Sequence, residues 1–337
     1  MALLRRKRAD PKVTIQLDKD YIVFQGSPQE ALGVYLSGTL AIQSREWAPV
    51  TCIRLHLRGL RISFQTGRRR GADKDEFFKR TWDFLEPSHS TGTVIGEYCF
   101  PFHVVLEGSL PETVEGLKEA SITYSLTAEI VYRGRILSIQ KPLRVIRVPQ
   151  PQYTDMILDQ VWKEKLACRV HIPNRLVAFG TSIYLACAFA PLVKGLKIEH
   201  IESQLLEFKE LGNGGSMASS IISSDRYTFE DRPSCENRRY QCSRRLGFPS
   251  GNCVQDVDVV GINVSHKLRV IVRMHNPDGH DSEVRLTVPV TIYLSPSWPV
   301  WHDVSIATRL PRPITDCSDE APPPYGKHEL DRLCQAF

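Results

Sequence analysis

The sequence predicts an all-β protein built from two consecutive β-sandwiches and a disordered C-terminal tail. Apolar residues recur at every second position in short runs, which is the period of a strand with one buried face. Gly and Pro separate these runs, and no stretch of comparable length before residue 149 shows the 3.6-residue period of a helix. The length of 337 residues exceeds one ordinary core and suits two domains.

The first sandwich is predicted over residues 12–149, after a basic N-terminal arm formed by residues 1–11. Alternation begins in residues 13–17 and returns in residues 53–57. The clearest example is residues 121–130, where Ile, Tyr, Leu and Ala alternate with Ser, Thr and Glu. Short strands joined by turns, without helices between them, favour a sandwich over a parallel α/β sheet.

The second sandwich is predicted over residues 150–300. Pro149 and Pro151 break the strand pattern because proline cannot donate a ladder hydrogen bond, so the domain boundary is placed there. Alternation resumes in three further runs, residues 168–172, 268–274 and 284–292. Asn276, Pro277, Asp278 and Gly279 predict the turn that joins the last two of these runs, since Pro presets φ and Gly supplies a positive φ.

Three segments of the second half lack a clean pattern. Residues 196–211 fit both a helix and a strand, and we favour a strand. Residues 181–193 are too short for the ~20 residues of a membrane-spanning helix and predict a buried strand and loop. Residues 212–252 are polar and rich in Gly, Ser and Arg, which predicts a flexible loop.

Composition and cysteine usage predict a cytoplasmic protein. The chain is 42% hydrophobic and 24% charged, values of the soluble globular class. Its first residues place a basic run, residues 5–8, after Leu3 and Leu4, without the apolar core of a signal peptide. The nine cysteines are an odd number without a CxxC pair, so reduced thiols are expected.

One group of cysteines and histidines has the side chains that bind zinc. Cys235 and Cys242 lie in the polar segment and Cys253 directly follows it, with three histidines downstream, His266, His275 and His280. Their spacings match none of the usual finger or ribbon patterns, so the sequence predicts no metal and no cofactor.

The sequence also predicts that the protein is not an enzyme. It contains no GxSxG elbow, no HExxH motif and no nucleotide-binding fingerprint. Its Ser, His and Asp residues are scattered along strands and loops, as in any sandwich.

Two groups of arginines are candidates for contact with anionic lipid headgroups or an acidic cargo tail. The first is Arg68, Arg69 and Arg70, and the second is Arg238, Arg239, Arg244 and Arg245. The alternative is that these charges belong to solvated loops. Nucleic acid is not an expected partner, because no stacking aromatics interleave with these arginines.

The tail, residues 301–337, contains the tetrapeptide Pro322, Pro323, Pro324 and Tyr325. Consecutive prolines favour polyproline II, in which Pro322 and Tyr325 lie on one face and fit the aromatic groove of a WW domain. Leu330 and Leu333 can share one helical turn and extend that docking surface. The alternative is a stiff piece of tail without a partner.

Two long segments carry a family resemblance. They are PFHVVLEGSLPETVEGLKEASITYSLTAEI, residues 101–130, and SHKLRVIVRMHNPDGHDSEVRLTVPVTI, residues 265–292. On them the chain resembles the alpha-arrestins, the arrestin-related trafficking adaptors, and fungal members in particular, over residues 12–300. The resemblance implies two immunoglobulin-like sandwiches of the arrestin type joined by a short hinge.

The resemblance also implies a function. Many alpha-arrestins use a PPxY motif to recruit a HECT-type ubiquitin ligase through its WW domains. We therefore expect an adaptor that binds plasma-membrane transporters or receptors, promotes their ubiquitination and endocytosis, and is recruited from the cytoplasm to the plasma membrane and endosomes. The alternatives are an arrestin-type scaffold for pH or carbon-source signalling and a retromer-like coat component. The single PPxY motif here lacks the avidity of paired WW contacts.

Overall fold

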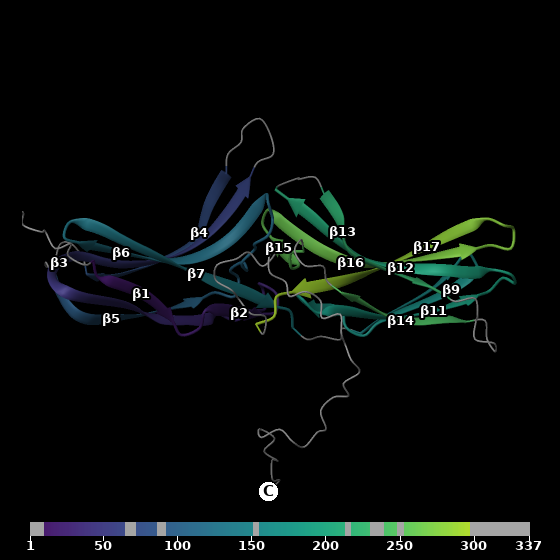
Figure 1. The fold of residues 1–337 in the computed structure, drawn as a ribbon, viewed down its shortest axis with the longest axis horizontal. Coiled ribbons are helices and arrows are strands. Elements are labelled where there is room, and N and C mark those ends of the chain that lie inside the picture. Colours follow the sequence, from purple (N-terminus) through teal and green to yellow (C-terminus); the bar gives the residue numbers. More distant parts are fainter. Residues whose placement is uncertain are drawn as a thin grey trace, which may run out of the picture.

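A computed structural model describes residues 10–64, 72–85, 92–150, 155–212, 217–229, 239–247 and 253–296. Every regular element in these ranges is a β-strand. Two β-sandwiches follow one another along the long axis of the molecule, the first in purple and blue and the second in green and yellow (Figure 1). The predicted all-β, two-sandwich fold is therefore confirmed. The tail that was expected to be disordered lies outside the described residues.

Seven strands build the first sandwich. They are β1 (Lys12–Leu17), β2 (Tyr21–Gln25), β3 (Val34–Phe64), β4 (Ala72–Leu85), β5 (Gly92–Leu106), β6 (Ala120–Tyr132) and β7 (Arg135–Val148). The 31-residue β3 serves both layers. Its first part pairs with β1 and β5, and after a register shift between Ser44 and Ala48 its second part pairs with β4 and β6.

Ten strands build the second sandwich. They are β8 (Met156–Trp162), β9 (Leu166–Ile172), β10 (Leu176–Ala178), β11 (Ser182–Pro191), β12 (Lys197–Leu211), β13 (Met217–Thr228), β14 (Tyr240–Gly247), β15 (Val257–Val259), β16 (Ile262–His275) and β17 (Asp281–Tyr293). One sheet has the order β10-β17-β16-β12-β13, with β15 paired to β16, and the other has the order β14-β11-β9-β8.

The alternating runs form the expected strands. In β6 the side chains alternate strictly between buried and half-buried positions, as the sequence pattern predicted. The ambiguous residues 196–211 form β12, so the preference for a strand is confirmed. The predicted turn at Asn276–Gly279 is also present. Gly279 has φ of 83°, and its amide donates to the Asn276 carbonyl at 3.0 Å.

One prediction was wrong. Residues 212–252 were expected to be a flexible loop, but within the described part of this segment β13 pairs with β12 and β14 pairs with β11. Both strands lie at sheet edges, and most side chains of β13 are exposed. An edge strand with polar residues on both faces does not show the hydrophobic alternation on which the prediction depended.

Two apolar cores fill the sandwiches. The first contains residues of β1 to β7 and also four residues from the second half of the chain, Val254, Val257, Ile262 and Val264. The second contains residues of β8 to β14, β16 and β17, together with Ile146 from the end of β7. The halves therefore interlock at their junction, and the boundary at residues 149 and 150 stays a prediction.

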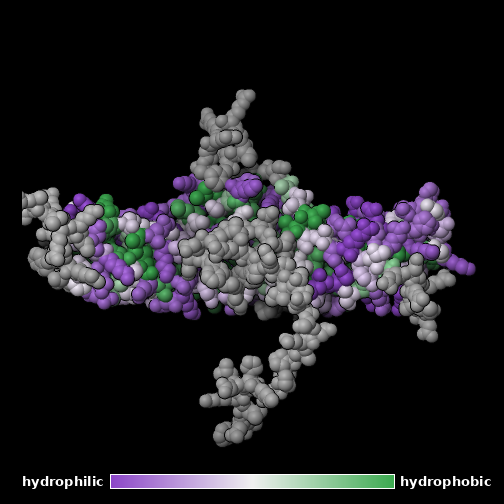
Figure 2. All heavy atoms as spheres, viewed as in Figure 1, coloured by the Kyte–Doolittle hydropathy of each residue, from purple (hydrophilic) through white to green (hydrophobic). Residues whose placement is uncertain are grey.

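The two sandwiches differ in the hydropathy of their surfaces. On the face shown in Figure 2, hydrophobic residues are interspersed over the first sandwich, whereas the far end of the second sandwich is mostly hydrophilic. Among the described residues there is no helix long and apolar enough to cross a membrane.

Candidate functional site

The junction between the sandwiches holds the most heavily bonded arginine of the described residues. Arg147, near the end of β7, is about one-tenth exposed. Its Nε donates to Glu112 at 3.0 Å, and its terminal nitrogens donate to the carbonyls of Gly26, Gly108 and Leu110 at 3.1, 2.9 and 2.7 Å. One side chain thus fixes two loops of the first sandwich beside the second. Loss of any one of these partners is expected to destabilise the fold, because it leaves a buried charge or polar group unpaired.

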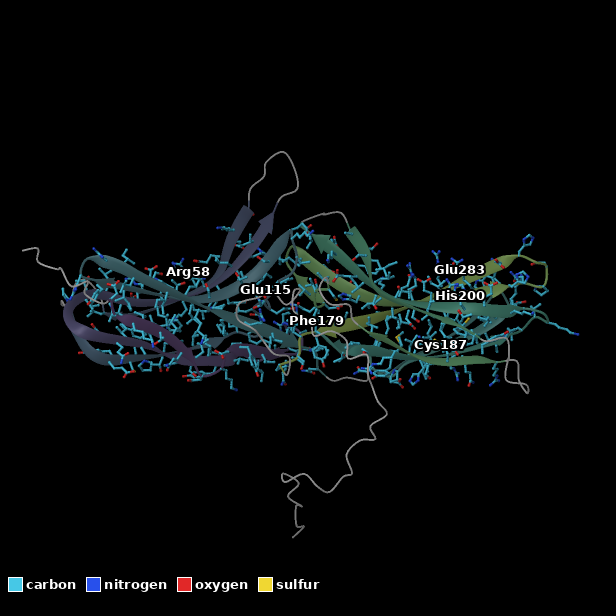
Figure 3. All side chains as sticks on the ribbon, viewed as in Figure 1. Arg58, Glu115, Phe179, Cys187, His200 and Glu283 are labelled. Atoms are coloured by element: carbon cyan, nitrogen blue, oxygen red, sulfur yellow. The ribbon has the colours of Figure 1, made fainter. Side chains whose placement is uncertain are left out.

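A second ion pair lies at the same end of the first sandwich. Arg144 donates to Glu115 at 2.6 Å, and both side chains are largely buried. In Figure 3 Glu115 of the first sandwich and Phe179 of the second are both labelled near the middle of the molecule. Charged pairs of the first half therefore gather where the two halves meet.

The segment 253–256 crosses the junction. Val254 belongs to the first apolar core, whereas the preceding Cys253 belongs to the second. Gln255 donates from Nε2 to the Thr113 carbonyl at 2.8 Å, and the backbone amide of Asp256 donates to the Ile292 carbonyl at 2.8 Å. The two middle residues of this short segment are thus tied to the first sandwich and the two outer residues to the second.

A buried cluster of ionisable side chains from the second sandwich contacts this segment. His266 of β16 lies between two carboxylates, with Nδ1 at 2.6 Å from Asp256 and Nε2 at 3.4 Å from Oε2 of Glu207 in β12. The Cys253 thiol lies 3.5 Å from the same Nε2. Glu207 also accepts a hydrogen bond from the Val254 amide at 2.9 Å and contacts Lys209 Nζ at 2.6 Å.

The electrostatics of this cluster follow from burial and pairing. Burial lowers the pKa of His266, but hydrogen bonds to Asp256, Cys253 and Glu207 outweigh it and raise the pKa to about 11. Burial raises the pKa of Glu207, but hydrogen bonds from His266, Lys209 and Val254 outweigh it, so the net shift is downward. Burial raises the pKa of the Cys253 thiol. At neutral pH the cluster is therefore an imidazolium between two carboxylates, beside a thiol.

A groove of about 380 Å³ opens next to these groups. Arg147 and Glu112 line it from the first sandwich, and Arg175 and Asp256 line it from the second. The groove is therefore lined by both positively and negatively charged side chains. Because these come from both sandwiches, its shape depends on how the two sandwiches pack.

The contacts of Glu207 and Asp256 with Cys253 and His266 were not predicted from the sequence. The strand positions of Glu207 and His266 were nevertheless a signal for them. Glu207 lies two positions after Leu205 and His266 lies two positions before Leu268, so both fall on the inward face of a strand. Ionisable residues at inward positions require partners in the fold. Of the other residues that the sequence offered as ligands, Cys242 lies in β14, His275 lies at the far end of β16 from the cluster, and Cys235 lies outside the described residues.

The basic residues are only partly described. Arg68, Arg69, Arg70 and Arg238 lie outside the described residues. Arg244 makes two hydrogen bonds to Asp225, at 2.7 and 2.8 Å, and its guanidinium lies over the Tyr227 ring. Arg245 follows directly in the same strand, so it points to the opposite face of the sheet and lies over Tyr184. Lipid or cargo contact by these arginines stays a prediction.

The predicted WW ligand, Pro322, Pro323, Pro324 and Tyr325, also lies outside the described residues. The same holds for Leu330 and Leu333. The docking function of the tail therefore stays a prediction.

Comparisons with known proteins identify the relatives of this chain. Residues 162–297 match the model of the arrestin (or S-antigen) C-terminal domain. The chain is 50% identical to the "HECT-type ubiquitin ligase-interacting protein apyA" of Emericella nidulans, over 96% of this chain and 95% of that protein.

More distant relatives share the same kind of name. The chain is 36% identical to proteins of Aspergillus terreus and Aspergillus clavatus, each named "Probable HECT-type ubiquitin ligase-interacting protein creD". Each match covers 95% of this chain but only 61% and 59% of those proteins, so the chain spans about three fifths of their length.

Proposed function

Because this chain belongs to the alpha-arrestins, in the group of fungal HECT-type ubiquitin ligase-interacting proteins, we propose that it is a ubiquitin-ligase adaptor. In this role it binds a plasma-membrane transporter or receptor, recruits a HECT-type ligase and promotes ubiquitination and endocytosis of the cargo. The observation that carries the proposal is the 50% identity to apyA over nearly the full length of both chains.

The ligase-binding element is the tail tetrapeptide Pro322 to Tyr325. A polyproline II ligand is largely preformed, so a WW domain binds it at little ordering cost. Leu330 and Leu333 extend the contact. Because the tail has one such motif, the affinity is that of a single site.

The cargo-binding element is the two-sandwich core. Strands and loops of both halves meet at the junction, where the groove is lined by residues from each. Loops positioned by a rigid scaffold are the usual place for recognition. The binding of a cargo tail that contacts both halves depends on the relative position of the two sandwiches.

A pull-down with isolated WW domains of a HECT-type ligase tests the ligase arm. Tyr325→Ala removes the aromatic residue of the motif and is expected to weaken binding at least tenfold, about 1.4 kcal/mol. His328→Ala, three residues later, is the matched control and keeps wild-type binding. Leu330→Ala with Leu333→Ala weakens binding less than Tyr325→Ala.

The same substitution in cells tests the cargo arm. Transporter internalisation and cargo ubiquitination are expected to fall with Tyr325→Ala and to persist with His328→Ala. If Tyr325→Ala leaves both ligase association and internalisation intact, the adaptor proposal fails. If ligase association is lost but internalisation persists, a signalling scaffold becomes the better description.

Peripheral recruitment to the plasma membrane and endosomes is the proposed location of this activity. Arg239 and Arg245 are exposed, and Arg244 donates to Asp225. The sharper test therefore reverses Arg239 and Arg245 to Glu and measures sedimentation with anionic liposomes. Each basic residue near such a surface contributes about 1 kcal/mol. Arg285→Glu in β17 is the control for a charge reversal elsewhere on the surface, and unchanged sedimentation of the double variant contradicts lipid contact.

A further inference from the structure

The buried cluster at the junction has the composition of a metal site. Glu207, Cys253 and His266 each offer one ligand atom, and these atoms lie within 4.8 Å of one another. The three side chains are 0%, 3% and 1% exposed. A thiolate, an imidazole and a carboxylate together are a donor set suited to zinc. They come from β12, the 253–256 segment and β16, so only the fold brings them together.

The distances match tetrahedral coordination. With Zn–S of about 2.3 Å, Zn–N of about 2.05 Å and Zn–O of about 2.1 Å, tetrahedral angles require S···N of about 3.5 Å and N···O of about 3.4 Å. The structure has 3.5 Å between Cys253 Sγ and His266 Nε2, and 3.4 Å between His266 Nε2 and Glu207 Oε2. These two distances fit the coordination of one ion, and the ligand atoms of Cys253 and Glu207 lie within 4.8 Å of each other.

The surroundings supply the outer contacts that a zinc-binding histidine requires. Asp256 Oδ1 lies 2.6 Å from His266 Nδ1, which fixes the ring and leaves Nε2 for the metal. Asp256 is itself held by the Ile292 amide at 2.8 Å. The Val254 amide and Lys209 orient Glu207. A water or the second Glu207 oxygen completes four-coordination.

The charges balance with and without the ion. Without it, Glu207, Asp256, a protonated His266, a neutral Cys253 thiol and Lys209 sum to zero. Binding Zn²⁺ releases the Cys253 thiol proton and the His266 Nε2 proton to solvent, and the sum remains zero. The exchange leaves no uncompensated buried charge, which is the main cost of ionic sites in protein interiors.

We propose that Cys253, His266 and Glu207 bind a zinc ion that fastens the 253–256 segment, and hence the junction between the two sandwiches. Asp256 is a positioning residue for His266. Because Val254 and Gln255 of this segment contact the first sandwich, the ion stiffens the contact between the two halves.

Cobalt(II) titration of the full-length, chelator-treated chain tests the proposal. We expect a thiolate-to-cobalt charge-transfer band that saturates at one equivalent and disappears when Zn²⁺ displaces the cobalt. Zn²⁺ is also expected to raise the thermal unfolding midpoint of the wild type. Both measurements use the unaltered protein, so they stand even where a variant folds poorly.

Substitutions of the proposed ligands and of control residues test which side chains bind the ion. Cys253→Ser abolishes the band, and Asp256→Asn weakens binding about 10- to 100-fold, the usual effect of losing such an outer carboxylate. Cys168→Ser, at a buried thiol of the same sandwich, and His275→Gln, in the exposed trio Glu199, His275 and Asp281, keep the band. Absence of the band in folded wild type, its persistence in Cys253→Ser, or its loss in His275→Gln overturns the proposal.

Discussion

The apolar interiors of the two sandwiches and the charged junction between them are stabilised in different ways. Each interior is filled by Leu, Ile, Val and Phe side chains from alternating strand positions. At the junction lie two charged networks, Arg147 with carbonyls of the first sandwich and His266 between two carboxylates of the second, beside apolar residues that each half places in the core of the other. Apolar packing is non-directional and tolerates exchange of similar side chains, whereas a buried ionic network depends on every partner.

The difference also concerns where in the sequence the partners lie. Neighbouring strands supply most core contacts, and these strands are recognisable one by one. At the junction Arg147 bonds to Gly26, 121 residues earlier, and Gln255 bonds to Thr113, 142 residues earlier. Of these two contacts only that from Gln255 to Thr113 crosses between the sandwiches, where it adds to apolar residues such as Val254 and Ile146 that each half places in the core of the other.

The largest effect is expected from Arg147→Met. The substitution keeps an unbranched side chain but leaves Glu112 buried and unpaired, which costs about 3–5 kcal/mol of unfolding free energy. Urea denaturation measures the loss. The matched control is Arg169→Met, because Arg169 makes an equally well-aligned pair with Asp159 on the surface, and exposed pairs contribute about 0–1 kcal/mol.

A double variant sharpens this test. Adding Glu112→Leu to Arg147→Met removes the orphaned carboxylate and is expected to recover part of the lost stability. If Arg147→Met costs no more than Arg169→Met, the junction is not the ionic network described above.

The next largest loss of stability is expected from truncating a core leucine to alanine. Leu57 in the first interior and Leu268 in the second are both fully buried, so Leu→Ala at either position is expected to cost about 2–5 kcal/mol. Ile136→Ala, at a position 71% exposed, is the surface control and should change stability by less than about 0.5 kcal/mol. A loss at Leu57 or Leu268 no greater than that at Ile136 contradicts the burial pattern.

A single hydrogen bond inside the first sandwich gives a smaller effect. The Tyr124 hydroxyl donates to the Pro111 carbonyl at 2.6 Å, and burial raises the pKa of Tyr124, so it remains a donor at all moderate pH values. Tyr124→Phe is expected to cost about 1 kcal/mol by thermal or urea unfolding. Tyr35→Phe, at an exposed ring, is the control, and equal effects of the two substitutions argue against a structural role for the Tyr124 bond.

The smallest effect is a pH dependence at His56. Burial lowers the pKa of His56 below 6.5, with Arg58 and Arg54 acting in the same direction and Glu129 opposing them. The folded state therefore resists protonation, so stability falls as the pH drops from 6.5 toward the folded pKa and is unaffected above 6.5. Urea denaturation at several pH values should show that His56→Gln removes this acid-side loss. An unchanged pH profile in the variant contradicts the assignment.

Strand-rich regions with one buried face were predictable from the sequence. In β6, β16 and β17 the inward residues recur at every second position, so the apolar core of each sandwich could be assigned before the fold was known. The exposed edge strand β13 was not predictable, because its pairing depends on the free edge of β12 and not on its own side chains. Alternation, turns and length predicted the two sandwiches, the family resemblance predicted their arrestin type, and the comparisons confirm membership of that family.

By itself the sequence determined the all-β class, the main buried faces and the presence of the tail motif. These features are local, because alternation and turn chemistry are encoded within a few residues. The tertiary structure alone decided that Glu207, Cys253, Asp256 and His266 share one buried site and that Arg147 links distant loops. The physical reason is that an ionic cluster requires ligand atoms within a few ångströms of one another, and residue spacing along separate strands does not specify such distances until the sheets pair and pack.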